Sequence, residues 1–148
     1  MKTPIIFNTS LIANLPIASA WNYLTDPAFL ISLDPKTRIK SVQNSGPMTP
    51  GAVVIVRLKY GQVSLHVDEV MPNHKFVFHY NSFPAQKVTC EYVFTSISDK
   101  ETRVAVKTEL RLLLPIFFRI FRRSIEKAMI ANFEAVLRKA EKMHVSDG

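Results

Sequence analysis

Tyrosines in three alternating segments are the first candidates for chemistry. Tyr60, Tyr80 and Tyr92 each fall on the face of their segment that the apolar alternation places in the interior. A phenol in an apolar pocket can orient a ligand carbonyl or donate a proton to it. The alternative is a packed ring whose hydroxyl reaches a partner at the rim. The pattern favours the packed ring and keeps all three as candidates.

His66 and Asp68 form a second candidate pair, because residues two apart in a strand share a face. They could act as a base with an orienting carboxylate, which makes His66 a further catalytic candidate. Leu65 and Val67 lie on the opposite face of the same segment. If Val67 points inward, His66 and Asp68 form a solvated patch, and this is the favoured interpretation. The orientation stays open at this point.

Three other polar or sulfur-bearing residues fall at expected interior positions. Asn132 lies within the apolar stripe of the C-terminal segment, where a buried amide needs a partner. That partner could equally be a ligand, a strand backbone or a water. Thr108 is expected to be a packed threonine on the last strand. Cys90, between Val88 and Tyr92, is expected to be a small buried hydrophobe, because no basic partner would stabilise its thiolate.

The remaining motifs of common enzymes and metalloproteins are missing. A single cysteine excludes an intrachain disulfide and a multi-cysteine zinc site, and the four histidines lack the spacing of a helical metal site. Four scattered glycines form no phosphate-binding loop, and neither G-x-S-x-G nor H-E-x-x-H occurs. We therefore expect no metal and no cofactor, and the sequence leans away from an enzyme.

The elements that would position these residues follow from hydrophobic periodicity. A strand at 5–12 precedes Pro16, a short helix at 18–25 and a second helical turn at 26–33. The period then changes to two, which predicts antiparallel strands with one packed face. These six strands lie at 39–43, 52–60, 63–70, 76–81, 87–94 and 103–112.

A long amphipathic helix from Pro115 to about Met143 closes the chain. Its expected apolar stripe consists of Phe118, Phe121, Ile125, Ala128, Met129, Asn132 and Val136. At about 1.5 Å per residue it spans some 40 Å, enough to cover the sheet. The gap between helix and curved sheet is the natural ligand cavity. Residues 1–148 form a single expected domain, with 1–3 and 144–148 flexible.

Charge and targeting patterns limit the partners. The chain has 148 residues, 19 of them Lys or Arg and 12 Asp or Glu, for a net charge of +7. No nucleic-acid motif accompanies this excess, so we expect no nucleic-acid partner. No run of 18 apolar residues occurs, and polar residues at 8–10 and 14 interrupt the one stretch that resembles a signal peptide. The expected location is the cytoplasm.

Aromatic and basic residues interleave at the start of the last helix. Transient contact with an anionic membrane is one interpretation, and a packed helix with a solvated basic back is the favoured one. The residues concerned are Phe117, Phe118, Arg119, Arg122 and Arg123.

The order of these elements resembles a known superfamily. The local matches are Leu15–Pro27 at the first helix, Pro50-Gly51, Asp68–Pro72 and Thr102–Val104. Over essentially the whole chain they are similar to the START-related helix-grip superfamily (SRPBCC). That group includes polyketide cyclase/dehydrase-like proteins, START lipid-transfer domains and the birch-pollen-allergen type. Many relatives carry a Trp where this chain has Leu33.

The resemblance implies an α+β helix-grip fold, with six to seven antiparallel strands wrapped around the C-terminal helix. It also implies a cavity for a lipid, polyketide or similar apolar molecule. We expect a monomer or homodimer. An aromatase/cyclase or dehydratase and a peripheral lipid-transfer module are the alternatives. The expected lining residues are Trp21, Val54, Val56, Tyr60, Phe78, Tyr80, Tyr92, Phe94, Val106, Thr108, Phe121, Met129, Asn132 and Phe133.

Overall fold

The structure, a computed structural model, has one long sheet and two described helices. It describes residues 5–26, 39–44, 49–58, 61–82, 85–112 and 115–147. The elements in chain order are β1 (Ile5–Ala13), α1 (Ile17–Leu24), β2 (Ile39–Asn44), β3 (Val53–Leu58), β4 (Gly61–Met71), β5 (Lys75–Ser82), β6 (Ala85–Ser98), β7 (Glu101–Leu112) and α3 (Pro115–Asp147). The second helical turn was predicted at 26–33, and all of it after residue 26 lies outside the described residues.

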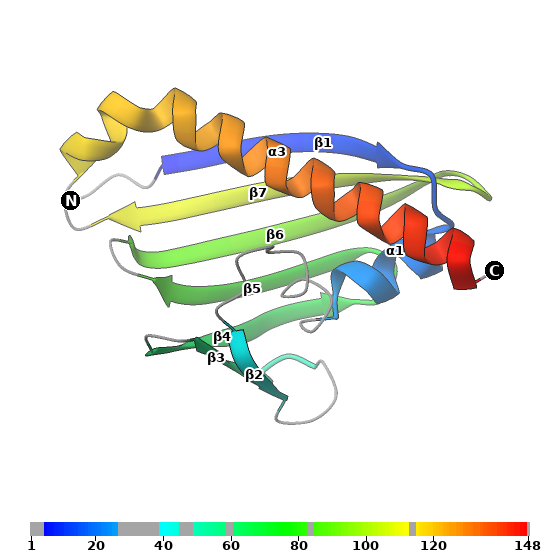
Figure 1. Cartoon of the computed structure of the whole chain (residues 1–148), viewed down its shortest axis with the longest axis horizontal. Coiled ribbons are helices and arrows are strands. Elements are labelled where there is room, and N and C mark those ends of the chain that lie inside the picture. The colour runs from blue at the N-terminus through cyan, green and yellow to red at the C-terminus, as the bar shows by residue number, and fades with distance from the viewer. Residues whose placement is uncertain are drawn as a thin grey trace.

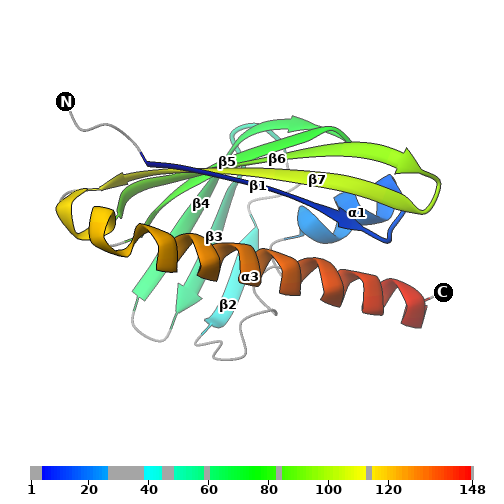
Figure 2. The same cartoon turned by 90° about the horizontal axis from the view of Figure 1, so that it is seen from above.

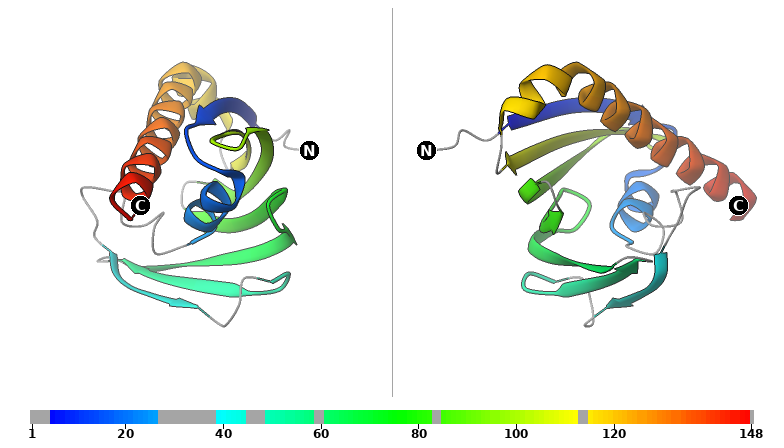
Figure 3. Two further views of the ribbon diagram at one scale, coloured as in Figure 1. Left: turned by 90° about the vertical axis from the view of Figure 1, so that its right-hand side faces the viewer. Right: turned by 60° about the vertical axis from the view of Figure 1, so that its left-hand side comes forward.

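The seven strands form one antiparallel sheet in the order β1-β7-β6-β5-β4-β3-β2 (Figure 1). Strands β2 to β7 follow each other as sequential antiparallel neighbours, and β1 pairs with β7. The sheet curls strongly, so that β1 and α3 lie at one end of the curve and β2 and β3 at the other (Figure 3). The predicted antiparallel α+β architecture is confirmed.

Local sequence explains where the elements begin and turn. Pro16 precedes α1 as its N-cap residue, and the Thr25 hydroxyl closes the helix by donating to the Trp21 carbonyl at 2.7 Å. Asn73 takes a φ of 60° in the β4–β5 turn, a left-handed conformation that asparagine tolerates. Gly51 takes a φ of 92° just before β3, where a side chain would be strained.

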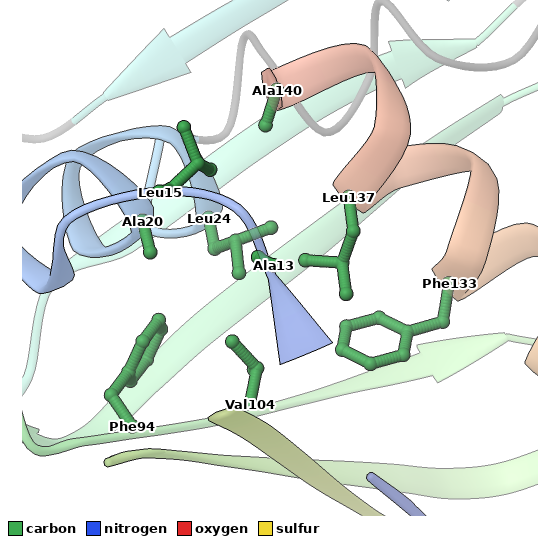
Figure 4. Packing of buried hydrophobic residues seen from close by; sticks show 9 residues of the cluster. All are labelled: Ala13, Leu15, Ala20, Leu24, Phe94, Val104, Phe133, Leu137 and Ala140. Carbon is green, nitrogen blue, oxygen red and sulfur yellow. The ribbon is translucent and has the colours of Figure 1, made fainter. Parts of the chain in front are cut away.

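One core cluster joins α1, the C-terminal half of α3 and the adjacent ends of the strands (Figure 4). Its members are Ala13, Leu15, Ala20, Leu24, Phe94, Val104, Phe133, Leu137 and Ala140. The buried Thr102 hydroxyl donates to the Leu15 carbonyl at 2.8 Å, which ties the segment after β1 to β7. This cluster anchors the helix to the sheet.

The long helix is rotated relative to the predicted stripe. Ala128 and Asn132 are exposed, whereas Phe133, Leu137 and Ala140 are buried. The reason is tertiary: α3 packs beside β1 and over α1 rather than across the middle of the sheet (Figure 2). The helix also continues to Asp147, past the predicted end near Met143.

None of the described helices combines the length and apolarity that a membrane crossing requires.

Candidate functional site

The floor of the site is built from cross-strand rows on the inner face of the sheet. Strand register places Phe7 opposite Thr108, and Thr108 opposite Cys90. The neighbouring row places Thr9 opposite Val106, and Val106 opposite Tyr92. Side chains at paired positions stand on the same face and touch, so β1, β7 and β6 present a continuous surface.

Helix α3 covers this floor and leaves a cavity of about 270 Å³. The stacked rings of Tyr92 and Phe133, with centroids 6.3 Å apart, connect floor and roof. Met129 and Val136 flank Phe133 on the helix. The described residues that line the cavity are Phe7, Asn8, Thr9, Tyr80, Cys90, Tyr92, Val106, Thr108, Glu126, Met129, Ile130, Asn132, Phe133 and Val136.

The titratable groups on the floor are held in their protonated forms. Burial raises the pKa of Tyr80 to about 12, and the neighbouring Cys90 adds to this. Burial likewise raises the pKa of the Cys90 thiol to about 12, against a smaller lowering by its side-chain hydrogen bond with Thr108. The pKa of Tyr92 is raised further by burial and by both neighbours. At neutral pH the two phenols are therefore hydrogen-bond donors, and the thiol is not a nucleophile.

Polar side chains mark where the cavity meets solvent. Asn8 and Asn132 are exposed, and Thr9 and Glu126 are half-buried. Asn132 therefore lies at the opening, and the predicted buried amide is wrong. Apolar walls with a few polar groups are the usual composition of small-molecule sites.

The structure brings seven of the expected ligand-binding residues to the cavity and places five others elsewhere. The seven are Tyr80, Tyr92, Val106, Thr108, Met129, Asn132 and Phe133. Trp21 packs edge-on against Phe76 and Phe94, with ring centroids 6.1 and 5.2 Å away. Phe94 and Phe78 are buried in the core, and so are the last two of the five, Val54 and Val56. These five contribute to the packing around the cavity and not to its described lining.

Two expected residues fall outside the description. Tyr60 lies outside the described residues, and so does the side chain of Phe121 in α3.

His66 is on the outer face of the sheet, as the alternation favoured, while Val67 is 2% exposed on the inner face. Asp68 is the extra residue of a bulge in β4, and its carboxylate contacts His79 Nδ1 at 2.7 Å. The rings of His66 and His79 stack with centroids 4.9 Å apart. Asp68 thus pairs with His79 on the adjacent strand β5, and not with His66, two residues earlier on its own strand. His66 cannot act on a ligand in the cavity, which corrects its catalytic candidacy there.

Sequence reasoning missed the contribution of β1 and of one acidic residue. Apolar pairs at 5–6 and 11–12 obscure which face of β1 is buried, and Ile6 and Ile12 turn out 38% and 42% exposed. Glu126 was not among the expected site residues. However, Met129 and Phe133 were both expected in the cavity, and their spacing of three and seven residues places Glu126 on the same side.

No group of three or more potential metal-ligating side chains gathers within the part of the chain that the structure describes.

Comparison with known proteins gives a fold and no sequence family. No protein-family model and no curated protein matches the chain. Among solved structures, the Zhui aromatase/cyclase from Streptomyces sp. R1128 matches with a TM-score of 0.72 and 14% identity over 95% of both chains. A norcoclaurine synthase from Thalictrum flavum matches with a TM-score of 0.70 and 13% identity over 97% of this chain and 98% of that one.

Ara h 8.0201 also matches, with a TM-score of 0.69 and 15% identity over 93% of this chain and 98% of the other. At such identities the likeness concerns the backbone arrangement. The chain has the same helix-grip fold as these structures.

Proposed function

We propose that the protein binds a small hydrophobic molecule in the cavity between the sheet and α3. The observation that carries the proposal is the composition of the lining. Phe7, Tyr92, Phe133 and Met129 offer apolar surface, while the Tyr80 hydroxyl and the rim residues offer hydrogen bonds. Burial of an apolar ligand there is favourable by roughly 25 cal/mol per Å² of apolar area removed from water.

Native mass spectrometry of freshly purified protein is the direct test. We expect a co-purifying apolar species, released on denaturation and identified by its mass. The same spectrum reports whether the protein is a monomer or a homodimer, the two states we propose. A clean apo mass combined with no uptake of a fluorescent apolar dye would contradict the proposal.

A matched pair of variants localises the binding. Val106→Phe fills the cavity from the floor, whereas Val93→Phe makes the same change on the outer face of β6. Because only the first change occupies ligand space, we expect dye binding to fall at least tenfold in V106F and to persist in V93F. Thermal unfolding of both variants confirms that each is folded. Equal binding in the two variants would place the ligand elsewhere.

Aromatase/cyclase-type chemistry in the same cavity is the second candidate. The observation that favours it is the pairing of protonated phenols, Tyr80 and Tyr92, with a carboxylate, Glu126, around one space. A carboxylate that removes the C–H proton next to a ketone becomes a carboxylic acid and leaves an enolate, whose oxygen a phenol stabilises by donating a hydrogen bond. Such enolisation begins aldol-type ring closure, and each group can contribute a factor of about a hundred or more.

Proton exchange tests this reaction without knowledge of the substrate. The bicyclic ketone β-tetralone exchanges its acidic C–H protons slowly in D₂O. We expect the wild-type protein to accelerate the exchange at least tenfold over buffer, and Glu126→Gln to lose the acceleration. Exchange at the buffer rate would leave binding as the function and reject the enzyme.

A further inference from the structure

Glu126 is the only acidic side chain among the described residues that line the cavity. It is half-buried on α3, three residues before Met129 and seven before Phe133, both of which contact the same space. A carboxylate in such a position accepts hydrogen bonds and cannot donate them when ionised. Any ligand in the cavity must therefore accommodate a negative charge at this wall.

Among the side chains that the structure describes, none forms an ion pair with Glu126 within 4.0 Å. Arg123, three residues earlier on the helix, is exposed. Arg122, four residues earlier, contacts β1. Its guanidinium donates to the Ile6 carbonyl at 3.4 Å and lies 5.6 Å from the centroid of the Phe7 ring. The carboxylate thus keeps its capacity to accept from a ligand.

The size and walls of the cavity limit the body of the ligand. A volume of about 270 Å³ is just below the usual range of small-molecule sites, roughly 300–1,000 Å³. The flat rings of Phe7, Tyr92 and Phe133 form much of the wall. Aromatic walls pack well against rings by stacking and edge contacts. A compact ring system fits this space better than a long acyl chain.

We infer that the cavity selects a compact ring-containing molecule that offers a hydroxyl or amino group to Glu126 and carries no carboxylate. The inference rests on the proposed function and specifies its ligand class. A hydroxyl or ammonium donor satisfies the carboxylate, and the Tyr80 and Tyr92 phenols can donate to an acceptor at the other side of the ligand. A ligand carboxylate would face like charge in a partly desolvated space, where repulsion is stronger than in water.

Three probes with one shared body test the selection. Each is a naphthalene that carries a hydroxymethyl, an aminomethyl or a carboxylate group at the same ring position. Their affinities are measured by calorimetry for the wild-type protein, for Glu126→Gln and for the control Glu134→Gln. Glu134 is exposed on the same helix and does not line the cavity, so its substitution changes the net charge equally.

We expect the alcohol and the amine to bind the wild type roughly tenfold or more tightly than the carboxylate. The gap should close in E126Q and persist in E134Q. Equal affinity of all three probes, or a gap that survives in E126Q, would overturn the inference while leaving the proposed function intact. Failure of every probe, the alcohol included, would overturn the proposed function itself. The wild-type comparison among probes does not depend on the folding of either variant.

Discussion

At the scale of single residues, the buried phenol of Tyr80 and thiol of Cys90 make the protein less stable at alkaline pH. The pKa values of Tyr80 and Cys90 are raised from 10.0 and 9.0 to about 12. Above pH 9 the unfolded chain releases these protons while the folded chain retains them. The unfolded state then binds fewer protons, so stability falls as pH rises. Their contribution is complete below pH 9 and is lost by about pH 12.

We therefore expect the free energy of unfolding to decline between pH 9 and 11. Urea titrations at pH 8, 9.5 and 11 measure the decline for the wild type and for Tyr80→Phe. Because Y80F lacks one of the titrating groups, its stability should fall less steeply over the same interval. Identical slopes for the two proteins would show that Tyr80 keeps its ordinary pKa in the folded state.

Thr102 gives a second residue-scale prediction, because its buried hydroxyl is bonded to the Leu15 carbonyl. Thr102→Val keeps the shape and removes the donor, which leaves a buried carbonyl without that partner. We expect a loss of about 1–3 kcal/mol in the free energy of unfolding. The control Thr95→Val, at an exposed position on β6, should stay within about 0.5 kcal/mol. A neutral T102V would mean that water replaces the hydroxyl.

At the scale of elements, one buried cluster attaches α3 to β1 and α1. The helix contacts β1 and α1, and its anchor is the cluster around Phe133, Leu137 and Ala140. This arrangement leaves the roof of the cavity near Glu126 and Met129 dependent on an anchor further along the same helix. The position of the roof, and with it ligand affinity, should be sensitive to that anchor.

Leu137→Ala tests the anchor. Leu137 is fully buried, so its truncation should cost about 2–5 kcal/mol of stability, through lost burial and the void left behind. Ser124→Ala, at an exposed site on the same helix, should change stability by less than about 0.5 kcal/mol. Chemical denaturation measures both. If L137A lost less than 1 kcal/mol, the helix would have to be held by other contacts.

At the scale of the whole molecule, much of the positive charge lies on α3, next to an exposed apolar side chain. From 119 to 142 the last helix carries seven Arg or Lys and three Glu, a difference of four out of the net +7. Ile120 is 71% exposed in this region, beside the exposed Arg122 and Arg123. Basic side chains that surround an exposed apolar residue can contact an anionic lipid surface.

We expect the protein to co-sediment with phosphatidylserine-containing vesicles at low salt and to be released at high salt, where charges are screened. Each basic residue near such a surface contributes about 1 kcal/mol, so Arg123→Glu should weaken binding roughly tenfold or more. The control Lys142→Glu makes the same change of charge near the other end of α3. Absence of binding at low salt would exclude membrane contact, and equal loss in both variants would indicate a diffuse charge effect.

Local patterns in the sequence determined the elements and most of the sheet. The alternation of period two in β3 to β7 reflects one packed and one wet face, and it placed Tyr92, Val106 and Thr108 on the inner side. A single cysteine excluded an intrachain disulfide, a conclusion that needs no structure. These features are local because each depends only on neighbouring residues in one segment.

The tertiary structure decided which of the inward residues form a wall and which fill the core. Phe78 and Phe94 alternate as the lining residues do, but the curl of the sheet buries both in the core, Phe94 against Trp21 of α1 and Phe78 against Phe76. The rotation of α3 turned Asn132 to the rim and brought Glu126 to the cavity. Helix rotation depends on long-range contacts with β1 and α1, which periodicity within the helix does not encode.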